Sequence, residues 1–340
     1  MTNRPAPSVA SENIAHDVRQ HLEGILPRLT ERDDVVGVTL NGGVARGHAD
    51  ELSEVDLTVY LTKGAKREWR RGRGPVATGI TTIDGQLYDV KSTSLTGERE
   101  RDWSAVERWD ASYADILYDP QGEVGDLIDE KLTWPSVEDG SGPLFECWWG
   151  FELACNCWIL RGDPHQAHFV LNDAVTALCK ALFVANEEHV PHRKWLVHLS
   201  RSLEWTPVDW TERLGSALET TELTIDDVHR RQAGIESLWI ELDEYVRKNH
   251  YPDLPVSVMQ MGFFVPLRTL VEDAPIAVDN WEASFGLELL GMEPFHTIAV
   301  VDRDEVVLDV ERLLEIGPDD MYQWHYELLD AVRSESEWND

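Results

Sequence analysis

The sequence predicts an α+β protein in which a mixed sheet with flanking helices is followed by a mainly α-helical domain. Short β-branched or alternating runs are concentrated in the first 135 residues, whereas apolar residues at helical spacing dominate after residue 143. A polar stretch rich in glycine, serine and proline, residues 136–143, separates the two patterns. We therefore expect two domains, 1–135 and 143–340, which agrees with the usual domain size for a chain of 340 residues.

Each element of the first domain follows from its periodicity. Apolar residues at helical spacing predict an amphipathic helix over residues 11–29, and further helices are expected at 104–109 and 122–132. β-rich runs predict strands at 35–40, 55–61, 76–83, 86–92 and 113–118. The dipeptide Asp84-Gly85 joins the third and fourth strands as a hairpin. Residues 63–74 form a basic segment, which we interpret as a solvated loop, with contact to an anionic substrate as the alternative.

The second domain is predicted to be helical along most of its length. Helical periodicity marks the segments 144–160, 165–186, 193–203, 210–219 and 225–248. Near the C-terminus, residues 297–301 and 305–308 are expected to pair as strands, and residues 318–332 to form a helix.

The charge of the chain is strongly acidic. There are 63 acidic residues against 30 basic ones, for a formal net charge of −33, and they are spread along the whole chain. An acidic surface of this kind favours adaptation to high salt, where counterions screen the self-repulsion, so we expect a halophilic protein. Non-specific binding to nucleic acid is not expected, because it needs a basic surface.

No feature of the sequence predicts a membrane or secreted protein. No stretch of about 18 apolar residues without a charge is present, and the N-terminus has no apolar run typical of a signal peptide. The four cysteines fall within one helical region and do not form the spacing of a disulfide framework. We therefore expect a cytoplasmic protein that has no membrane partner.

A glycine-rich turn joins the first two predicted strands. Gly42 and Gly43 let the backbone approach a ligand closely and expose N–H groups that suit phosphate oxygens. Arg46 can add a charge-assisted contact to the same phosphates, and Ser53 offers a hydroxyl. A glycine pair alone is more often an ordinary turn, so its meaning depends on the carboxylates that follow it.

Three carboxylates follow this turn. Glu54 and Asp56 are two residues apart at a strand start, so both point to one face. Asp89 lies in the middle of a later strand, with apolar neighbours on either side. Carboxylates on one face repel one another unless a cation lies between them, and Mg²⁺ prefers carboxylate, water and phosphate oxygens. The sequence therefore predicts a metal site made of Glu54, Asp56 and Asp89.

These motifs together resemble the DNA polymerase β-like nucleotidyltransferase superfamily. Its pattern is a glycine turn, an Arg-Gly pair, two acids separated by one residue at a strand start, and a third acid on another strand. Here the pattern is Gly42-Gly43, Arg46-Gly47, Glu54-x-Asp56 and Asp89. The chain is most similar in character to antibiotic, aminoglycoside-type nucleotidyltransferases and related uncharacterised proteins with a C-terminal helical domain. The resemblance covers roughly residues 10–200, and the segment 185–196 resembles part of that helical domain.

The resemblance implies a reaction and a role for each residue. A nucleotidyl group would pass from an NTP, with ATP expected, to an acceptor hydroxyl, releasing pyrophosphate with the help of two Mg²⁺ ions. Glu54 and Asp56 would bind both ions and Asp89 the catalytic one. The triphosphate would lie against the turn and a lysine of the helical domain: Gly42, Gly43, Arg46, Ser53 and Lys194, with Lys180 as the alternative lysine.

Several points stay open at this stage. The superfamily usually has aspartate where this chain has Glu54, which is one methylene longer. The general base is Asp89 acting through its metal or a carboxylate of the helical domain, with candidates at Glu146, Glu152, Glu187 and Glu188. The acidic surface suits a cationic, aminoglycoside-like acceptor. The alternatives are a regulatory or antitoxin-like module that binds or modifies a partner protein, and a degenerate homologue that binds nucleotide without turnover.

Overall fold

The computed structural model describes residues 4–335, and its internal contacts divide the chain into two units. The first unit contains Met1–Ser136 and Leu182–Thr211, and the second contains Val137–Ala181 and Glu212–Asp340. The chain therefore leaves the first unit at residue 136 and later returns to it for one segment of 30 residues, 182–211.

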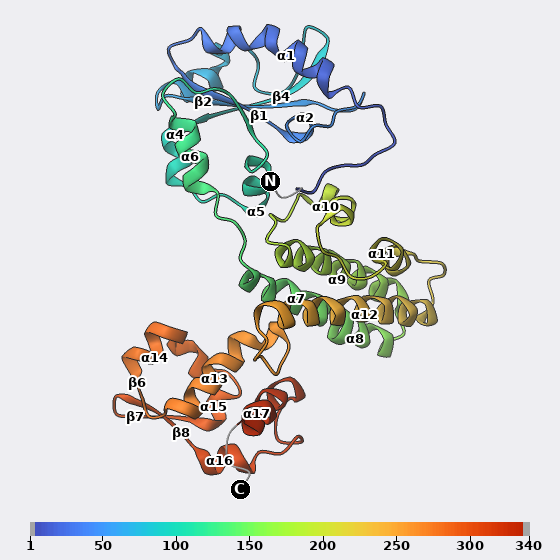
Figure 1. Cartoon of the computed structure of the whole chain (residues 1–340), viewed down its shortest axis with the longest axis vertical. Coiled ribbons are helices and arrows are strands. Elements are labelled where there is room, and N and C mark those ends of the chain that lie inside the picture. The colour runs from blue at the N-terminus through green and yellow to red at the C-terminus, as the bar shows by residue number, and fades with distance from the viewer. Residues whose placement is uncertain (1–3, 336–340) are drawn as a thin grey trace. The chain divides into compact units, whose positions relative to one another are not determined.

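The first unit is built on a mixed sheet of five strands (Figure 1). In chain order the strands are β1 (Val35–Asn41), β2 (Val55–Leu61), β3 (Gly79–Ile83), β4 (Gln86–Ser94) and β5 (Asp115–Tyr118). Their order in the sheet is β3-β4-β2-β1-β5. Strands β2 and β4 are parallel, and the other neighbouring pairs are antiparallel. The α+β class and all five strands of the first domain are thereby confirmed.

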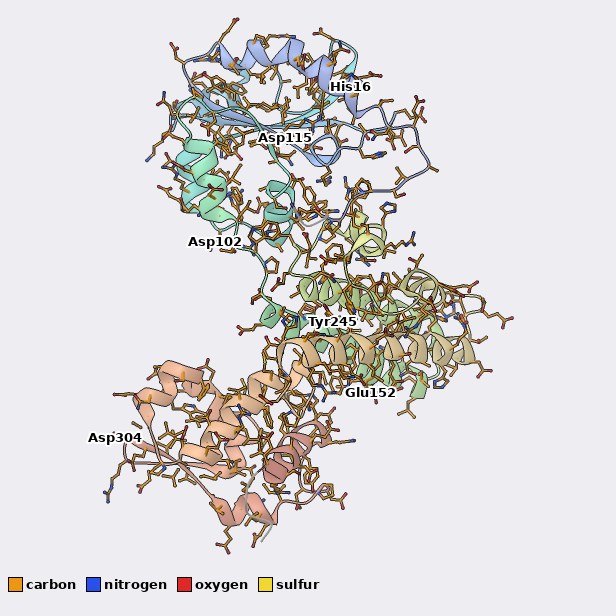
Figure 2. The ribbon with its side chains drawn as sticks, in the orientation of Figure 1. His16, Asp102, Asp115, Glu152, Tyr245 and Asp304 are labelled. Carbon is orange, nitrogen blue, oxygen red and sulfur yellow. The ribbon has the colours of Figure 1, made fainter. Side chains whose placement is uncertain are left out.

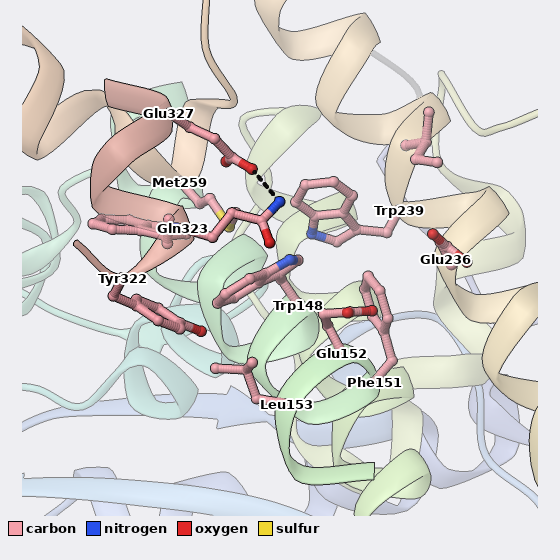
Figure 3. A pocket seen from close by; sticks show the side chains of 12 residues that line it. Trp148, Phe151, Glu152, Leu153, Glu236, Trp239, Met259, Tyr322, Gln323 and Glu327 are labelled. Carbon is pink, nitrogen blue, oxygen red and sulfur yellow. Dashed lines mark hydrogen bonds between the residues drawn. The ribbon is translucent and has the colours of Figure 1, made fainter. Parts of the chain in front are cut away.

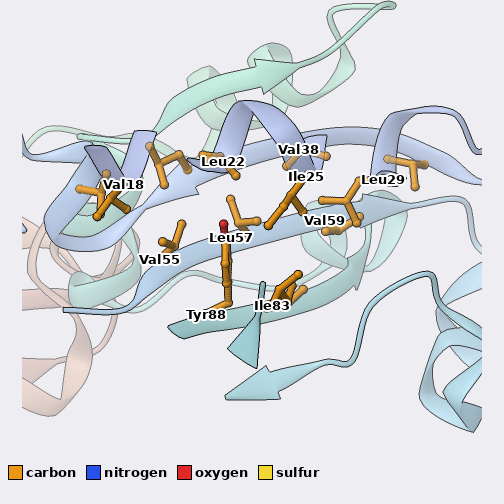
Figure 4. Close-up of a cluster of buried hydrophobic side chains, with 14 of the residues drawn as sticks. Val18, Leu22, Ile25, Leu29, Val38, Val55, Leu57, Val59, Ile83 and Tyr88 are labelled. Carbon is orange, nitrogen blue, oxygen red and sulfur yellow. The ribbon is translucent and has the colours of Figure 1, made fainter. Parts of the chain in front are cut away.

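Helix α1 (Ala15–Thr30) covers one face of this sheet. Its residues at helical spacing, Val18, Leu22, Ile25 and Leu29, are buried against side chains of the central strands (Figure 4). The helix begins four residues later than predicted, because the Asn13 carboxamide oxygen accepts hydrogen bonds from the N–H groups of Ala15 and Ala49, both at 3.1 Å. Asn13 thus ties the start of α1 to the segment that follows the glycine turn.

Helices that follow β4 in the chain cover the opposite face of the sheet. Helices α4 (Leu95–Glu100) and α6 (Glu123–Lys131) pack there around Tyr60, Trp103 and Leu127. Helix α5 (Ala105–Ala111) begins at Ser104, whose side chain forms a capping box with Glu107. The sequence predicted α5 and α6 but not α4.

The basic segment 63–74 is not the solvated loop that the sequence predicted. It contains a short helix, α3 (Ala65–Glu68), followed by a π-helical turn, η1 (Trp69–Arg73). Trp69 is only 2% exposed, and its indole N–H lies 3.4 Å from a carboxylate oxygen of Asp34. Burial of this large aromatic side chain anchors the segment, although its arginines remain exposed.

Segment 182–211 adds the end of one long helix and two short ones to the first unit. Helix α9 (Pro164–Ala185) crosses the division between the units, and α10 (Arg193–Leu199) and the 3₁₀ turn η4 (Ser200–Ser202) follow it. His192 caps α10 by accepting a hydrogen bond from the N–H of Lys194. The cap fixes the first turn of α10, on which Lys194 and Trp195 lie.

The second unit is mainly helical, as predicted. Its first part contains η2 (Val137–Gly140), α7 (Ser141–Trp148), η3 (Trp149–Ala154), α8 (Cys155–Leu160), α11 (Trp210–Leu218, which begins in the first unit) and α12 (Ile225–His250). Beyond residue 250 it contains η5 (Val258–Gln260), α13 (Met261–Asp273), α14 (Val278–Phe285), η6 (Leu287–Gly291), α15 (Phe295–Ile298), α16 (Val310–Glu315) and α17 (Gln323–Glu335). The strands β7 (Ala299–Asp302) and β8 (Glu305–Leu308) pair as predicted, and β6 (Ile276–Ala277) adds a third strand.

A fully buried arginine connects the helices of the second unit. Arg231 of α12 donates to the carbonyl of Ala217 and to the carboxamide of Asn172, both at 2.7 Å, and lies 2.9 Å from Nδ1 of His168. Burial lowers the pKa of Arg231 and of His168. These hydrogen bonds compensate for the burial of the Arg231 charge, and they join α12 to α9 and α11.

Helix α9 alone among the described residues has the length and apolar composition to cross a membrane. In its most apolar window, 67% of the residues are buried inside the protein, as in the core helix of a globular unit. Acidic side chains occur in both units, for example Asp102 and Asp115 in the first and Glu152 and Asp304 in the second (Figure 2).

Candidate functional site

The carboxylates that the sequence singled out lie where β1 ends and β2 begins. In the parallel pairing of β2 and β4, Asp56 is aligned with Asp89, and in the antiparallel pairing of β1 and β2 it is aligned with Asn41. Aligned residues of neighbouring strands project to the same face of a sheet. Glu54 lies two residues before Asp56, just outside β2. The register therefore places Asp89 on the strand beside Asp56.

Gly42 allows Asp56 to approach the backbone of the turn. A Cβ atom on Gly42 would lie 1.8 Å from Oδ2 of Asp56, so no other residue fits between them. The φ angle of Gly42 is +67°, in the left-handed region that favours glycine. Gly43 is also closely packed, because its Cβ would lie 2.9 Å from the carbonyl oxygen of His48. Gly42 is thus required by the position of the Asp56 carboxylate, and Gly43 by the position of the His48 backbone.

The carboxyl group of Asp56 is difficult to ionise. Its pKa is raised from the ordinary value of 3.8 to about 6, chiefly by burial and also by the neighbouring negative charges of Asp110, Glu54 and Asp89. The ammonium group of Lys91 acts in the opposite direction. A carboxylate surrounded by others in this way is one that a bound cation would stabilise.

Asp110 of α5 occupies the two groups that the sequence assigned to phosphate. Its Oδ1 accepts a hydrogen bond from the N–H of Gly42 at 3.2 Å and another from the guanidinium of Arg46 at 2.9 Å. The Arg46 side chain is only 6% exposed and lies 4.3 Å from the ring centroid of Trp109 and 5.9 Å from that of Trp195. The turn therefore already holds a carboxylate of its own chain.

A cavity of about 300 Å³ opens beside these groups, wholly within the first unit. Six of the residues predicted for the site line it: Gly43, Arg46, Ser53, Glu54, Asp56 and Lys194. Gly42 and Asp89 do not line it. The hydroxyl of Ser53 accepts from the N–H of Asp50 and donates to its carboxylate, at 2.9 and 3.0 Å. Lys194 comes from α10, so the returning segment supplies a positive charge to the wall.

The donor set suits a divalent cation in kind, because it consists of carboxylate oxygens on a partly buried surface. The side chains as placed are more dispersed than a metal centre requires. In the described part of the chain, no three histidine, cysteine, aspartate or glutamate side chains are grouped so that they could hold an ion. Asp89, whose side chain is 25% exposed, has Lys91 at 4.0 Å as an ion-pair partner.

The alternatives for the lysine and the general base are placed as follows. Lys180 forms an ion pair with Glu146 at 3.5 Å, and both residues belong to the second unit. Glu188 forms an ion pair with Arg4 at 2.9 Å in the first unit. None of these residues lines the cavity beside Asp56, whereas Lys194 does.

Sequence reasoning missed six residues of the cavity and its surroundings. Four of them line the cavity: His48, Asp50, Leu52 and Trp195. The other two, Trp109 and Asp110 of α5, hold the guanidinium of Arg46. Asp110 lies 68 residues after Gly42 and in no recognisable motif, so its hydrogen bond to the turn depends on how α5 packs. His48 follows the glycine turn closely in the sequence and is buried, with 7% of it exposed.

A second hollow of about 150 Å³ lies on the same face of the sheet. Its lining includes Thr58 of β2 and Lys91 of β4, each two residues beyond an aligned carboxylate, and Asp110. Side chains two residues apart on a strand share a face. Asp110 and Lys91 therefore line this hollow, and their charges also act on the pKa of Asp56.

Comparison with known proteins gives a distant likeness to solved structures. No model of a protein family matches the sequence, and no curated protein matches it either. Among solved structures, a nucleotidyltransferase-like protein from Exiguobacterium sibiricum 255-15 is similar, with a TM-score of 0.41 and 12% sequence identity. The match covers 86% of this chain and 100% of that one. A likeness this distant assigns neither an activity nor a ligand to the chain.

Proposed function

We propose that the first unit is a nucleotidyltransferase that transfers a nucleotidyl group from an NTP, with ATP expected, to a hydroxyl of an acceptor and releases pyrophosphate. The observation that carries this proposal is the position of Asp56. Its largely buried carboxylate lies against Gly42, among the charges of Glu54, Asp89 and Asp110, at a cavity that Lys194 also lines. Crowded carboxylates beside a cationic wall suit a metal–triphosphate complex.

Glu54, Asp56 and Asp89 are the residues that would hold Mg²⁺. Bound there, the metal would favour ionisation of the attacking hydroxyl and stabilise the charge that develops on the leaving pyrophosphate. Glu54 and Asp89 are partly exposed, so their side chains are free to change rotamer and converge on Asp56. Asp56 is held in place by the close fit against Gly42 and is the fixed point of the set.

Lys194 and Arg46 would bind the triphosphate. Both line the cavity, and charge-assisted hydrogen bonds from such groups to phosphate oxygens are among the stronger polar contacts in proteins. Arg46 is held by Asp110 at 2.9 Å, so it would exchange this carboxylate for a phosphate when the nucleotide binds. The ring of Trp109, with its centroid 4.3 Å from the guanidinium carbon, would stay in contact with Arg46 through that exchange.

Replacing Lys194 by methionine is expected to weaken NTP binding by about tenfold, the effect of losing one charge-assisted contact. Calorimetric titration with an NTP and Mg²⁺ measures this change. Arg193→Met is the matched control, because it removes a positive charge from the neighbouring position, which does not line the cavity. Equal weakening in both variants would indicate a general charge effect and contradict a direct contact by Lys194.

Replacing Asp110 by asparagine is expected to tighten NTP binding by about three- to tenfold. The change removes a negative charge that competes with phosphate for Gly42 and Arg46 but keeps the size of the side chain. The same titration measures it, with Asp102→Asn of the first unit as a control at an exposed position. Weaker binding in the Asp110 variant would instead make Asp110 a ligand of the metal.

The proposal is tested by an acceptor screen with labelled NTPs. The assay follows Mg²⁺-dependent pyrophosphate release with hydroxyl compounds that include aminoglycosides, in high KCl because the net charge of −33 favours adaptation to salt. Transfer that disappears in Asp56→Ala is the expected result. Undiminished transfer in that variant, or no binding of any NTP with Mg²⁺, would overturn the proposal.

A second candidate function is nucleotide binding without turnover. Two observations favour it: the described side chains do not form a three-ligand metal group, and Asp110 already occupies the N–H of Gly42 and the guanidinium of Arg46. In this case calorimetry would detect NTP binding, and no acceptor would yield pyrophosphate. The Asp110→Asn variant would still tighten binding, so the two candidates differ only in turnover.

A further inference from the structure

The second unit contains its own cavity, of about 470 Å³, which is within the range of small-molecule sites (Figure 3). Its walls come from the turn where α7 passes into η3, from the middle of α12, from η5 and from the start of α17. All of its lining residues belong to the second unit, and none belongs to the set around Asp56.

The walls of this cavity are unusually aromatic. Aromatic residues make up 9% of the chain but five of the twelve lining residues: Trp148, Phe151, Trp239, Tyr322 and Trp324. The ring of Trp239 is fixed, because its indole N–H donates to the carbonyl of Leu144 at 2.9 Å and Phe151 packs against it edge to face at 5.9 Å. Trp239 is therefore held in place before any ligand binds.

The charged residues of the lining are all acidic. Glu152, Glu236 and Glu327 contribute carboxylates, and no lysine, arginine or histidine lines the cavity (Figure 3). Within residues 4–335, none of these three glutamates forms an ion pair with a basic side chain, although nearby glutamates such as Glu146 and Glu241 do. Glu327 accepts hydrogen bonds only from the neutral amides of Gln260 and Gln323, each at 3.3 Å. The negative charge in the cavity is thus not neutralised by the protein.

We propose that this cavity binds an organic ammonium cation that carries methyl or methylene groups. The positive charge of such a ligand is attracted both by the faces of tryptophan rings and by the carboxylates, and its apolar groups fill the space between the rings. An anion would be repelled by the three glutamates. An inorganic cation would make no use of the aromatic walls, and a neutral apolar molecule would make no use of the carboxylates.

The general acidity of the chain does not by itself explain this combination. Acidic residues are spread over the whole sequence, so carboxylates near any one cavity carry little information. The tryptophans carry more information than the carboxylates. Large apolar side chains normally pack closely together, whereas here they surround an open cavity. Trp239 and Trp324 are 9% and 7% exposed, so their rings are part of the core as well as of the cavity wall.

The first experiment compares a cation with its neutral isostere on the full chain. Choline and 3,3-dimethylbutan-1-ol have nearly the same shape and differ in charge, so calorimetric titrations at one fixed KCl concentration isolate the effect of the ammonium group. Choline is expected to bind at least about tenfold more tightly. Equal affinity for the two, or binding of neither, would overturn the proposal.

The second experiment locates the binding within this cavity. The triple substitution Glu152→Gln, Glu236→Gln and Glu327→Gln keeps the side-chain shapes and is expected to weaken choline binding by at least about tenfold. Asp330→Asn is the control, because it removes an exposed carboxylate from α17 outside the lining. Trp148→Leu gives a second readout through the ring contact, and near-ultraviolet circular dichroism checks that each variant is folded. Unchanged affinity in the triple variant would overturn the assignment.

A third arm distinguishes the source of the ammonium group. A peptide that contains trimethyllysine presents the same chemistry as choline but on a protein chain. Tighter binding of the peptide assigns the site to a protein partner, and tighter binding of choline assigns it to a free small molecule; both outcomes support the proposal. Asp56→Asn is expected to leave choline affinity unchanged, so this inference stands or fails independently of the nucleotidyltransferase assignment.

Discussion

Replacing Asp56 by asparagine is expected to produce a protein that is more stable than the wild type above pH 7 and yet has lost almost all of its transfer activity. The pKa of Asp56 is raised from 3.8 to about 6, mainly by burial and then by the charge of Asp110. A pKa difference of this size means that the ionised carboxylate lowers the free energy of unfolding by at most about 3 kcal/mol. Asparagine keeps the shape of the side chain and removes the charge, so this cost disappears.

The pH dependence of this effect follows from the direction of the pKa change. Below about pH 4, Asp56 is protonated in both the folded and the unfolded chain, so its ionisation does not affect the free energy of unfolding. Between about pH 4 and pH 6, the unfolded chain loses the proton first, and the wild type loses stability relative to the variant. Above about pH 7 the difference is constant. Urea denaturation from pH 4 to 8 in fixed KCl measures the difference, and a variant that is less stable at pH 8 would contradict the raised pKa.

Magnesium provides a second readout that does not depend on activity. If Asp56 is a metal ligand, Mg²⁺ should raise the melting temperature of the wild type and have a much smaller effect on Asp56→Asn. Transfer activity should fall on the order of 10³-fold, because the metal contributes several kcal/mol to the reaction. Asp50→Asn is the control within the same cavity. Hydrogen bonds from Ser11 and Ser53 lower the pKa of Asp50, so removing that carboxylate should not stabilise the protein.

Replacing Gly42 by alanine is expected to cost about 2–5 kcal/mol of stability and to abolish the metal-dependent rise in melting temperature. The left-handed backbone at φ +67° disfavours any side chain, and the new methyl group would lie 1.8 Å from Oδ2 of Asp56. The carboxylate must therefore move away from the turn. Thermal unfolding with and without Mg²⁺ measures both consequences.

Gly47→Ala is the matched control for this experiment. Gly47 has a similar backbone conformation, with φ +83°, but open space where its Cβ would be. It should lose only the backbone contribution, about 1–2 kcal/mol, and keep the response to Mg²⁺. If the two alanine variants behave alike, the close approach of Asp56 to Gly42 has no importance for the site.

The elements that the sequence predicted correctly are those that depend on local chemistry. The hairpin of β3 and β4 turns at Asp84 and Gly85, whose φ angles of 48° and 91° are the ones that an Asp-Gly pair adopts readily. Helix α1 buries the residues that recur at helical spacing. Segment 63–74 was misinterpreted because its many charges concealed Trp69, a single buried residue that decides the conformation of the segment.

The sequence by itself determined that Glu54 and Asp56 share a face and follow a glycine turn, since both features depend on residues a few positions apart. The tertiary structure alone decided what surrounds Asp56. The strand register aligns Asp89 with it, the packing of α5 brings Asp110 to Gly42 and Arg46, and the segment 182–211 brings Lys194 to the cavity. The aromatic cavity of the second unit likewise joins residues 148, 239 and 324. Backbone periodicity encodes which face of an element is buried, but the neighbour on that face is chosen by packing between segments far apart in the chain.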